Sequence, residues 1–218
     1  MGAPRFHRVR ALSLAAGLVV WSFVSPRLPG PWRIALQAGV GGLLVLVTRA
    51  PLGLGPPRLW AGLRLGSCAA IVAASTVGAT TLVPPVRRSM AMRELPAPVP
   101  VPGWLLLHIP VGTVWAEESA FRAALATVGT AAFGKAGGRL LQAAGFGLSH
   151  IADARATGEP VIATVLVTGV GGWLFGWLAD RTGSLAAPML AHLAINEAGA
   201  IAALTLQRRP AKDRAPGF

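Results

Sequence analysis

The sequence predicts an all-α protein, a polytopic transmembrane bundle of about seven to eight membrane helices. The composition points there first, because 53% of the 218 residues are hydrophobic and only 13% are charged. A soluble domain carries about 25% charged residues, since its surface faces water. A chain with so few charges needs a different surrounding, and the hydrocarbon of a lipid bilayer fits it. We therefore expect the bilayer to be its main partner.

The spacing of the apolar residues supports the same fold. Crossing a bilayer takes about 20 residues, with a range of roughly 17–25. The apolar segments are 11–25, 31–48, 65–84, 104–129, 137–152, 161–178 and 184–206. The N-terminus resembles a signal peptide, but the boundary at Ser25-Pro26 lacks a small-x-small cleavage site, so we expect an uncleaved first span. Both termini are basic, which would suit an even number of spans and leaves an eighth span open.

The net charge of +12 has the distribution of membrane flanks. Arginines stand at the ends of apolar runs, for example Arg10, Arg49 and Arg209. Because no basic domain with interleaved aromatic residues is present, we do not expect nucleic acid as a partner. The basic residues divide almost equally between the two sides, so they do not decide the orientation. The preference for arginine over lysine, with abundant Ala and Gly, suggests a GC-rich bacterial genome and hence a bacterial cytoplasmic membrane.

Two connecting stretches organise the chain. Residues 51–64 are expected to form a loop and an interfacial turn, with Trp60 at headgroup level. Residues 85–103 contain five prolines and cannot form a continuous helix. We therefore divide the chain into three regions. They are 1–103 (membrane helices and Pro-rich linker, a scaffold), 104–206 (catalytic membrane core) and 207–218 (basic tail).

Chemically capable side chains concentrate after this linker. No acidic residue precedes Glu94, and the single cysteine, Cys68, lies in an apolar run without polar neighbours. Ionisable groups at membrane depth cost several kcal/mol unless they are paired or face a wet cavity. Three clusters need such an explanation. They are Glu117-Glu118-x-x-x-Arg122, Phe146-x-x-x-His150 and His192-x-x-x-Asn196.

The spacing within each cluster suggests roles. Glu118 and Arg122 are four residues apart and can form an ion pair on one helical face. His192 and Asn196 likewise share a face and offer two hydrogen-bond donors. Glu117 is offset by roughly 100° from Glu118, so it is free for another partner. A free carboxylate, an imidazole and a donor pair that converge in a bundle would form a hydrolytic centre that activates water.

Structural roles compete with these for each residue taken alone. The Glu118–Arg122 pair by itself favours a purely structural ion pair, and Glu197 is expected to snorkel or to pair with a basic group. His108 lies nine residues before Glu117, so on an α-helix it faces roughly the opposite side. We therefore expect it at the membrane interface. The combination of five polar groups on three helices favours chemistry over packing.

The ordered trio EExxxR, FxxxH and HxxxN resembles the CPBP family, which includes the CAAX prenyl endopeptidases. The stretch from Arg181 to Leu185, ahead of Pro188, is also similar to that family's lead-in to its third motif. The resemblance covers about residues 104–200. Ala123 departs from it, because many relatives have Gly after the motif arginine. It implies an intramembrane endopeptidase that hydrolyses a peptide bond of a membrane-anchored peptide or protein.

The resemblance also implies the role of each motif residue. Glu117 and His150 would activate the water, His192 and Asn196 would form the oxyanion hole, and Glu118 and Arg122 would support them. No cofactor is then required, and the familiar HExxH spacing for zinc is absent. A zinc ion held by Glu117, His150 and His192 stays open as a metalloprotease alternative. A non-catalytic scaffold or a bacteriocin-immunity-type protein of the same family is the second functional candidate, and a small transporter with a buried proton relay is the third.

Overall fold

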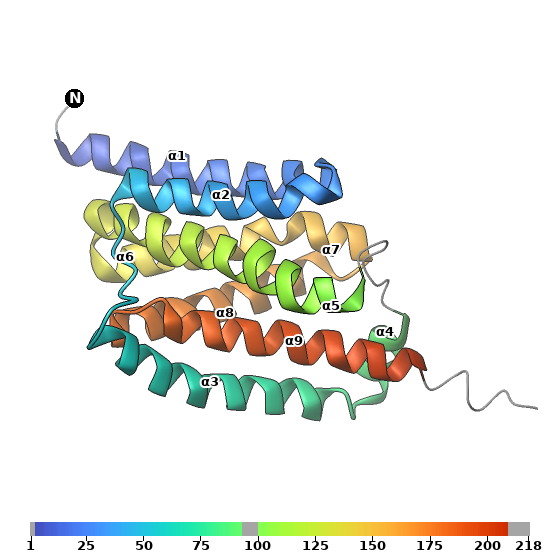
Figure 1. The fold of residues 1–218 in the computed structure, drawn as a ribbon. Coiled ribbons are helices and arrows are strands. Elements are labelled where there is room, and N and C mark those ends of the chain that lie inside the picture. The colour runs from blue at the N-terminus through green and yellow to red at the C-terminus, as the bar shows by residue number, and fades with distance from the viewer. Residues whose placement is uncertain (1–2, 93–99, 209–218) are drawn as a thin grey trace, which may run out of the picture.

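The computed structural model describes residues 3–92 and 100–208. Over these residues the chain is helical and contains no strand, which confirms the predicted all-α fold. The helices lie side by side with nearly aligned axes (Figure 1). The run from α5 through α6 lies between α1 and α2 on one side and α3, α8 and α9 on the other. This central run carries Glu117, Glu118, Arg122 and, at its end, His150.

Four described helices are long and apolar enough to cross a membrane. They are α1 (Ala3–Val24), α3 (Arg58–Thr80), α8 (Val161–Thr182) and α9 (Ala186–Arg208). A shorter apolar helix, α2 (Gly30–Thr48), follows a 3-10 turn, η1 (Ser25–Arg27). Large apolar side chains such as Leu46, Ile71 and Ile162 are exposed on the outside, as in lipid-facing helices. The chain is an integral membrane protein, and the number of its spans stays a prediction.

The central run is formed by several consecutive helical segments. They are α5 (Val101–Gly103), the π-helical η2 (Trp104–Trp115) and η3 (Glu118–Leu125), and α6 (Ala126–Ser149). A π-helix has more residues per turn than an α-helix and is frequent at functional sites. Pro110 lies inside η2. Bundles tolerate such a proline where neighbouring groups satisfy the freed carbonyls.

α6 turns back on itself at Gly134, whose φ of +72° is readily adopted only by glycine. The two arms then lie close together. A Cβ added to Gly129 would lie 3.1 Å from the Cα of Gly138. Further along the hairpin the rings of Phe121 and Phe146 meet edge to face with their centroids 5.2 Å apart. This turn separates the predicted segments 104–129 and 137–152.

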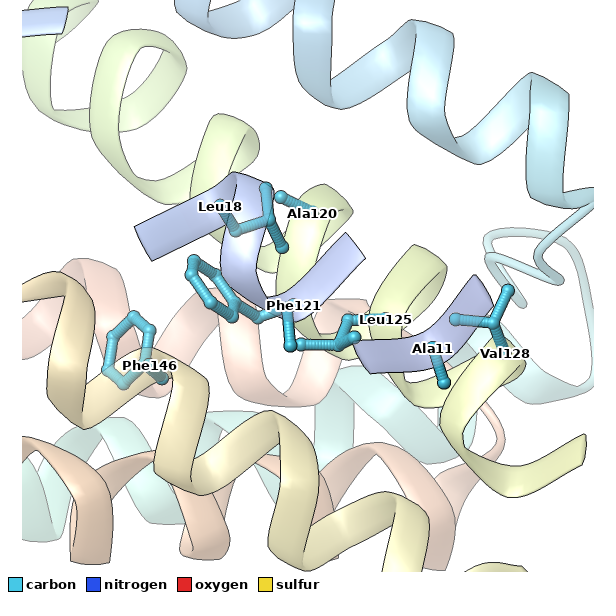
Figure 2. Close-up of a cluster of buried hydrophobic side chains, with 8 residues drawn as sticks. Ala11, Leu18, Ala120, Phe121, Leu125, Val128 and Phe146 are labelled. Carbon is cyan, nitrogen blue, oxygen red and sulfur yellow. The ribbon is translucent and has the colours of Figure 1, made fainter. Parts of the chain in front are cut away.

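The N-terminal helices pack against this hairpin. α1 contributes Ala11, Ala15 and Leu18 to a buried apolar cluster that also contains Phe121 and Phe146 (Figure 2). α2 approaches η2 and η3 closely, and the Trp115 indole donates a hydrogen bond to the Ala38 carbonyl at 3.2 Å. On the other side, α3 packs on α9 through small residues. A Cβ added to Gly66 would lie 2.8 Å from the Cα of Ala187.

One prediction about the connections needs correction, and a second agrees with the described residues. Residues 51–64 are not all loop, because α3 begins at Arg58 and includes Trp60, which is exposed. The linker 85–103 begins as a short helix, α4 (Pro84–Met92), since its prolines at this end stand where a helix starts and need no backbone donor. Residues 93–99 lie outside the described part, as does most of the predicted basic tail 207–218. The proposed division into three regions therefore stays a prediction.

Candidate active site

A cavity of about 1180 Å³ lies between the helices and extends to residues of η1, α4 and α7 (Ile151–Thr157). Its walls include Glu117, His150, His192 and Asn196, which come from three separate parts of the chain. Glu117 directly precedes η3, His150 stands between α6 and α7, and the other two lie on α9. The four side chains that the sequence singles out for water activation and oxyanion binding thus share one cavity.

Behind the cavity wall lies a fully buried ion pair. Arg122 Nη1 is 3.2 Å from Glu118 Oε1, and both side chains are 0% exposed. The same carboxylate oxygen lies 2.7 Å from Nδ1 of His192, which is nearly buried. A carboxylate can only accept, so the imidazole donates here. Isolated buried charges are strongly unfavourable, and this arrangement gives Glu118 a cation and a hydrogen-bond donor.

Two phenylalanines fix the positions of these groups. The Arg122 guanidinium carbon lies 3.9 Å from the Phe146 ring centroid and 5.0 Å from that of Phe175. Phe175 also lies against the His192 ring, with centroids 5.1 Å apart and an interplanar angle of 31°. Cation–π contacts of this kind gain strength where water is excluded. Phe175, on α8, was not predicted as a site residue because an aromatic residue in an apolar segment gives no polar signal.

His150 is oriented by its own helix end. Its Nδ1 lies 2.8 Å from the carbonyl oxygen of Phe146, one turn earlier. Because a carbonyl only accepts, Nδ1 carries the proton, and in the neutral ring Nε2 holds the lone pair. The Phe146 ring packs edge-on against the imidazole at 4.6 Å. The FxxxH motif therefore orients its histidine through both the backbone and the side chain of its phenylalanine.

Glu117 differs from its neighbour Glu118 in both burial and partners. Its side chain is 31% exposed, and Oε2 makes no hydrogen bond within the described part of the chain. The nearest basic atom recorded for it is His192 Nε2 at 3.7 Å, which is too long for a direct hydrogen bond. The Glu118 carboxylate is thus fully buried and paired through Oε1, whereas the adjacent Glu117 side chain is partly exposed and has no ion pair closer than 3.7 Å in the described part of the chain.

The outward donor pair predicted on α9 is only partly present. The Asn196 amide donates to the backbone carbonyl of His192 at 3.1 Å, which uses one of its two hydrogens. His192 Nδ1 is committed to Glu118, so only Nε2 is left to face the cavity. The predicted i, i+4 spacing puts both residues in the cavity wall, but local bonds decide which atoms remain available.

His108 corrects another prediction. It was expected on the opposite side of the helix from Glu117, yet both line the same cavity. The segment between them is π-helical, so nine residues come closer to two full turns than they do in an α-helix. Glu197 is partly buried on α9 and is not in the cavity wall.

The described residues contain no group of three His, Cys, Asp or Glu side chains placed to hold a metal ion. The alternative zinc ligands Glu117, His150 and His192 line one cavity without forming such a group. Nδ1 of His192 faces Glu118 and Nδ1 of His150 faces a carbonyl, which leaves Nε2 of each ring toward the cavity, as in many metal-ligating histidines. Metal dependence therefore stays a prediction.

Comparison with known proteins gives one family. Residues 99–198 match the model of the Rce1-like family, described as type II CAAX prenyl endopeptidase Rce1-like. No curated protein and no solved structure matches the chain. The matched region spans all three motifs and ends shortly after Asn196. The resemblance predicted from the sequence is thereby confirmed, and the chain is an integral membrane protein whose residues 99–198 are similar to the Rce1-like, CAAX-type endopeptidase family.

Proposed function

We propose that this cavity is the active site of an intramembrane endopeptidase that uses Glu117 and His150 to activate water. One observation carries the proposal. The partly exposed Glu117 side chain lines the same cavity as His150, His192 and Asn196, next to a buried network in which Oε1 of Glu118 is paired with Arg122 and His192. A purely structural role for Glu117 predicts a direct partner for its carboxylate, yet its Oε2 makes no hydrogen bond within the described residues.

The chemistry begins with removal of a proton from water. Glu117 accepts it, assisted by Nε2 of His150, while the water oxygen attacks the carbonyl carbon of the scissile peptide bond. The negative charge that develops on the carbonyl oxygen is met by the second amide hydrogen of Asn196 and by Nε2 of His192 in its doubly protonated form. Collapse of the tetrahedral intermediate breaks the C–N bond, and the proton passes to the leaving amine.

The buried residues support this step without touching the substrate. Glu118 holds Nδ1 of His192, and Arg122 balances the charge of Glu118. The ring of His192 is thereby fixed, and its Nε2 faces the side of the cavity that holds Glu117. The arrangement follows the general logic of a reactive residue oriented by a second residue, which is in turn held by a third.

The proposed reaction needs no cofactor, and its substrate is a membrane-anchored peptide or protein. The cavity lies within a bundle whose surroundings are lipid, which favours substrates that partition into the bilayer. We propose the bacterial cytoplasmic membrane as its location and residues 104–206 as the catalytic core. Metal independence is tested by dialysis against a strong chelator. Metal independence would be contradicted if the active protein contained stoichiometric zinc, lost its activity when the zinc was removed and regained it when zinc was added back.

The decisive experiment compares two glutamates. Purified protein in liposomes is incubated with a library of acylated peptides, and the products are identified by mass spectrometry. We expect Glu117→Gln to lower cleavage by about a thousandfold or more, because the amide cannot accept the proton. His150→Ala should abolish cleavage as well, and both variants should keep wild-type thermal stability.

Glu197→Gln is the matched control, since it makes the same substitution on a partly buried membrane glutamate outside the cavity wall. It should leave cleavage near the wild-type rate. Near-normal proteolysis by Glu117→Gln would show that the base is assigned wrongly. Failure of the wild-type protein to cleave any peptide would favour a non-catalytic role instead.

A further inference from the structure

Part of the cavity wall comes from helices outside the region that matches the family. The N-terminal helices contribute apolar residues such as Leu18 and Trp21 together with a few polar ones. Among the polar ones, Gln37 on α2 is half-buried, and its Oε1 is buried without a hydrogen-bond partner in the described part of the chain. Neither the family motifs nor the proposed reaction uses this side chain.

Three contacts between α2 and the neighbouring π-helical segment fix the position of Gln37 along the helix axes. Ile34 Cγ1 would lie 3.3 Å from a Cβ added to Gly112. The Ala38 carbonyl accepts the Trp115 indole N–H at 3.2 Å. One turn further, a Cβ added to Gly41 would lie only 3.0 Å from the Ala116 carbonyl oxygen. α2 therefore runs alongside η2 in the same direction.

These contacts hold Gln37 beside the turn that leads into Glu117. Ala116 directly precedes Glu117, and its neighbour on α2 is Gly41. Gln37 lies one turn before Gly41 on the same helix. Both Gln37 and Glu117 line the cavity. The N-terminal half therefore supplies a polar side chain to the same cavity wall, about one helical turn along α2 from the contact with Ala116.

The chemistry of a carboxamide narrows what this group can be. It offers an acceptor oxygen and two N–H donors on one rigid plane, and a peptide group presents one N–H donor and one acceptor oxygen that can pair with them. A buried acceptor without a partner is unfavourable, and a ligand N–H that reaches it gains the full benefit of that hydrogen bond. An extended peptide in the cavity has free N–H and C=O groups along its backbone, whereas a lipid chain has none.

We propose that Gln37 is a substrate-positioning residue that hydrogen-bonds a backbone amide of the bound peptide beside the scissile bond. This inference rests on the proposed function for the identity of the substrate, but it concerns binding and not the hydrolytic step. It gives the N-terminal half a direct part in substrate recognition through a polar contact.

Binding is measured without hydrolysis. Protein carrying Glu117→Gln is placed in nanodiscs on beads, and the probe is a pool of short, palmitoylated, fluorescein-labelled peptides. Retained fluorescence above that of empty nanodiscs reports binding. Adding Gln37→Leu should weaken retention about tenfold, the loss of one well-placed hydrogen bond, while thermal stability stays unchanged. Gln37→Met repeats the test with a flexible apolar side chain.

Gln142→Leu is the matched control. Gln142 is fully buried on α6, donates to the Gly172 carbonyl at 2.8 Å and is not in the cavity wall. Its replacement should lower thermal stability and leave peptide retention unchanged. The opposite assignment, in which Gln37→Leu and Gln37→Met lower thermal stability but retain the peptides normally, would overturn the inference.

A second probe tests the backbone contact itself. Pools are prepared in which one backbone amide, at a different position in each pool, is replaced by an ester, which removes the N–H. We expect one position to weaken retention by the parent protein and to have no effect on Gln37→Leu. Equal sensitivity of both proteins at every position would refute the contact.

The outcomes separate this inference from the proposed function. If the protein with Glu117 intact cleaves nothing while retention depends on Gln37, binding is as inferred and proteolysis is wrong. If it cleaves peptides and Gln37→Leu leaves KM unchanged, proteolysis stands and the inference fails.

Discussion

The two halves of the molecule differ in how they treat polar groups. Among the described residues, the N-terminal helices up to Met92 hold one fully buried polar side chain, Ser25, and contain no acidic residue. The C-terminal part from Val101 onward buries six polar or charged side chains. They are Glu118, Ser119, Arg122, Gln142, Ser184 and His192. The C-terminal part therefore balances its own charges, and the N-terminal helices supply mainly shape.

The family model matches residues 99–198, the part of the chain that holds the buried charges. A buried ion pair tolerates little change, because removing either partner leaves an uncompensated charge. A helix that presents small and apolar residues to its neighbour can change most of its side chains while keeping its volume.

The largest expected effect comes from breaking the charge balance. Arg122→Ala leaves the Glu118 carboxylate buried without its cation, which should cost about 3–5 kcal/mol and remove most folded protein. Thermal unfolding in detergent measures this. Arg139→Ala is the control, since its pair with Asp180 is partly exposed and should contribute at most about 1 kcal/mol. Equal losses in the two variants would contradict the contrast between a buried network and a surface pair.

The second-largest expected effect tests whether the close packing of the N-terminal helices positions the active site. A valine at Gly41 would meet Ala116 and Ser119 and push α2 away from the turn that carries Glu117. A displacement near 1 Å at reacting groups can cost about a hundredfold in rate. We expect such a loss of proteolysis for Gly41→Val and none for Gly39→Val, which has open space around it. Similar activity in both variants would mean that this wall has no influence on the site.

A smaller effect is expected from Phe175. Replacing it by leucine removes its contacts with Arg122 and His192, and we expect kcat to fall about tenfold with little change in KM. Phe175→Tyr should restore activity, because it keeps the ring. Leu178→Ala, one turn away in the same apolar cluster, should instead lower thermal stability with kcat maintained. A lower kcat in Leu178→Ala together with normal kcat in Phe175→Leu would reverse the assignment.

The smallest effect should come from the lipid-facing surface of α2. Leu36 is exposed on the same helix as Gln37. Leu36→Ala should change stability by less than about 0.5 kcal/mol and leave both proteolysis and peptide retention unaltered. A clear loss of retention in this variant would mean that α2 acts as a whole and not through the face that carries Gln37 and Gly41.

The sequence predicted the parts of this site that have a polar signal at regular spacing. The helical segments, the Glu118–Arg122 pair and the presence of the three motifs in one bundle all follow from hydropathy and i, i+4 spacing. The π-helical backbone around Glu117 has no such signal. It caused the wrong placement of His108, because the period assumed for the helix was 3.6 residues.

Other features depend on packing between distant segments. Phe175 and Gln37 become site residues only because α8 and α2 bring them to the cavity. A phenylalanine among apolar residues or a single glutamine in a membrane helix gives no indication of this. The Asn196 amide shows a further limit. Its position in the cavity wall was predicted, but its bond to the His192 carbonyl depends on a local choice among hydrogen-bond partners.

The bond between His192 and Glu118 has a consequence for biosynthesis. The two residues are 74 positions apart, and the histidine lies on the last described helix. Membrane proteins are made from the N-terminus, so Glu118 and Arg122 enter the bilayer together as a pair that is neutral overall, well before the imidazole exists. The hydrogen bond that orients His192 forms only when α9 has packed against the rest of the bundle. Under the proposed function, a chain synthesised only as far as α8 lacks this histidine and therefore cannot cleave its neighbours in the membrane.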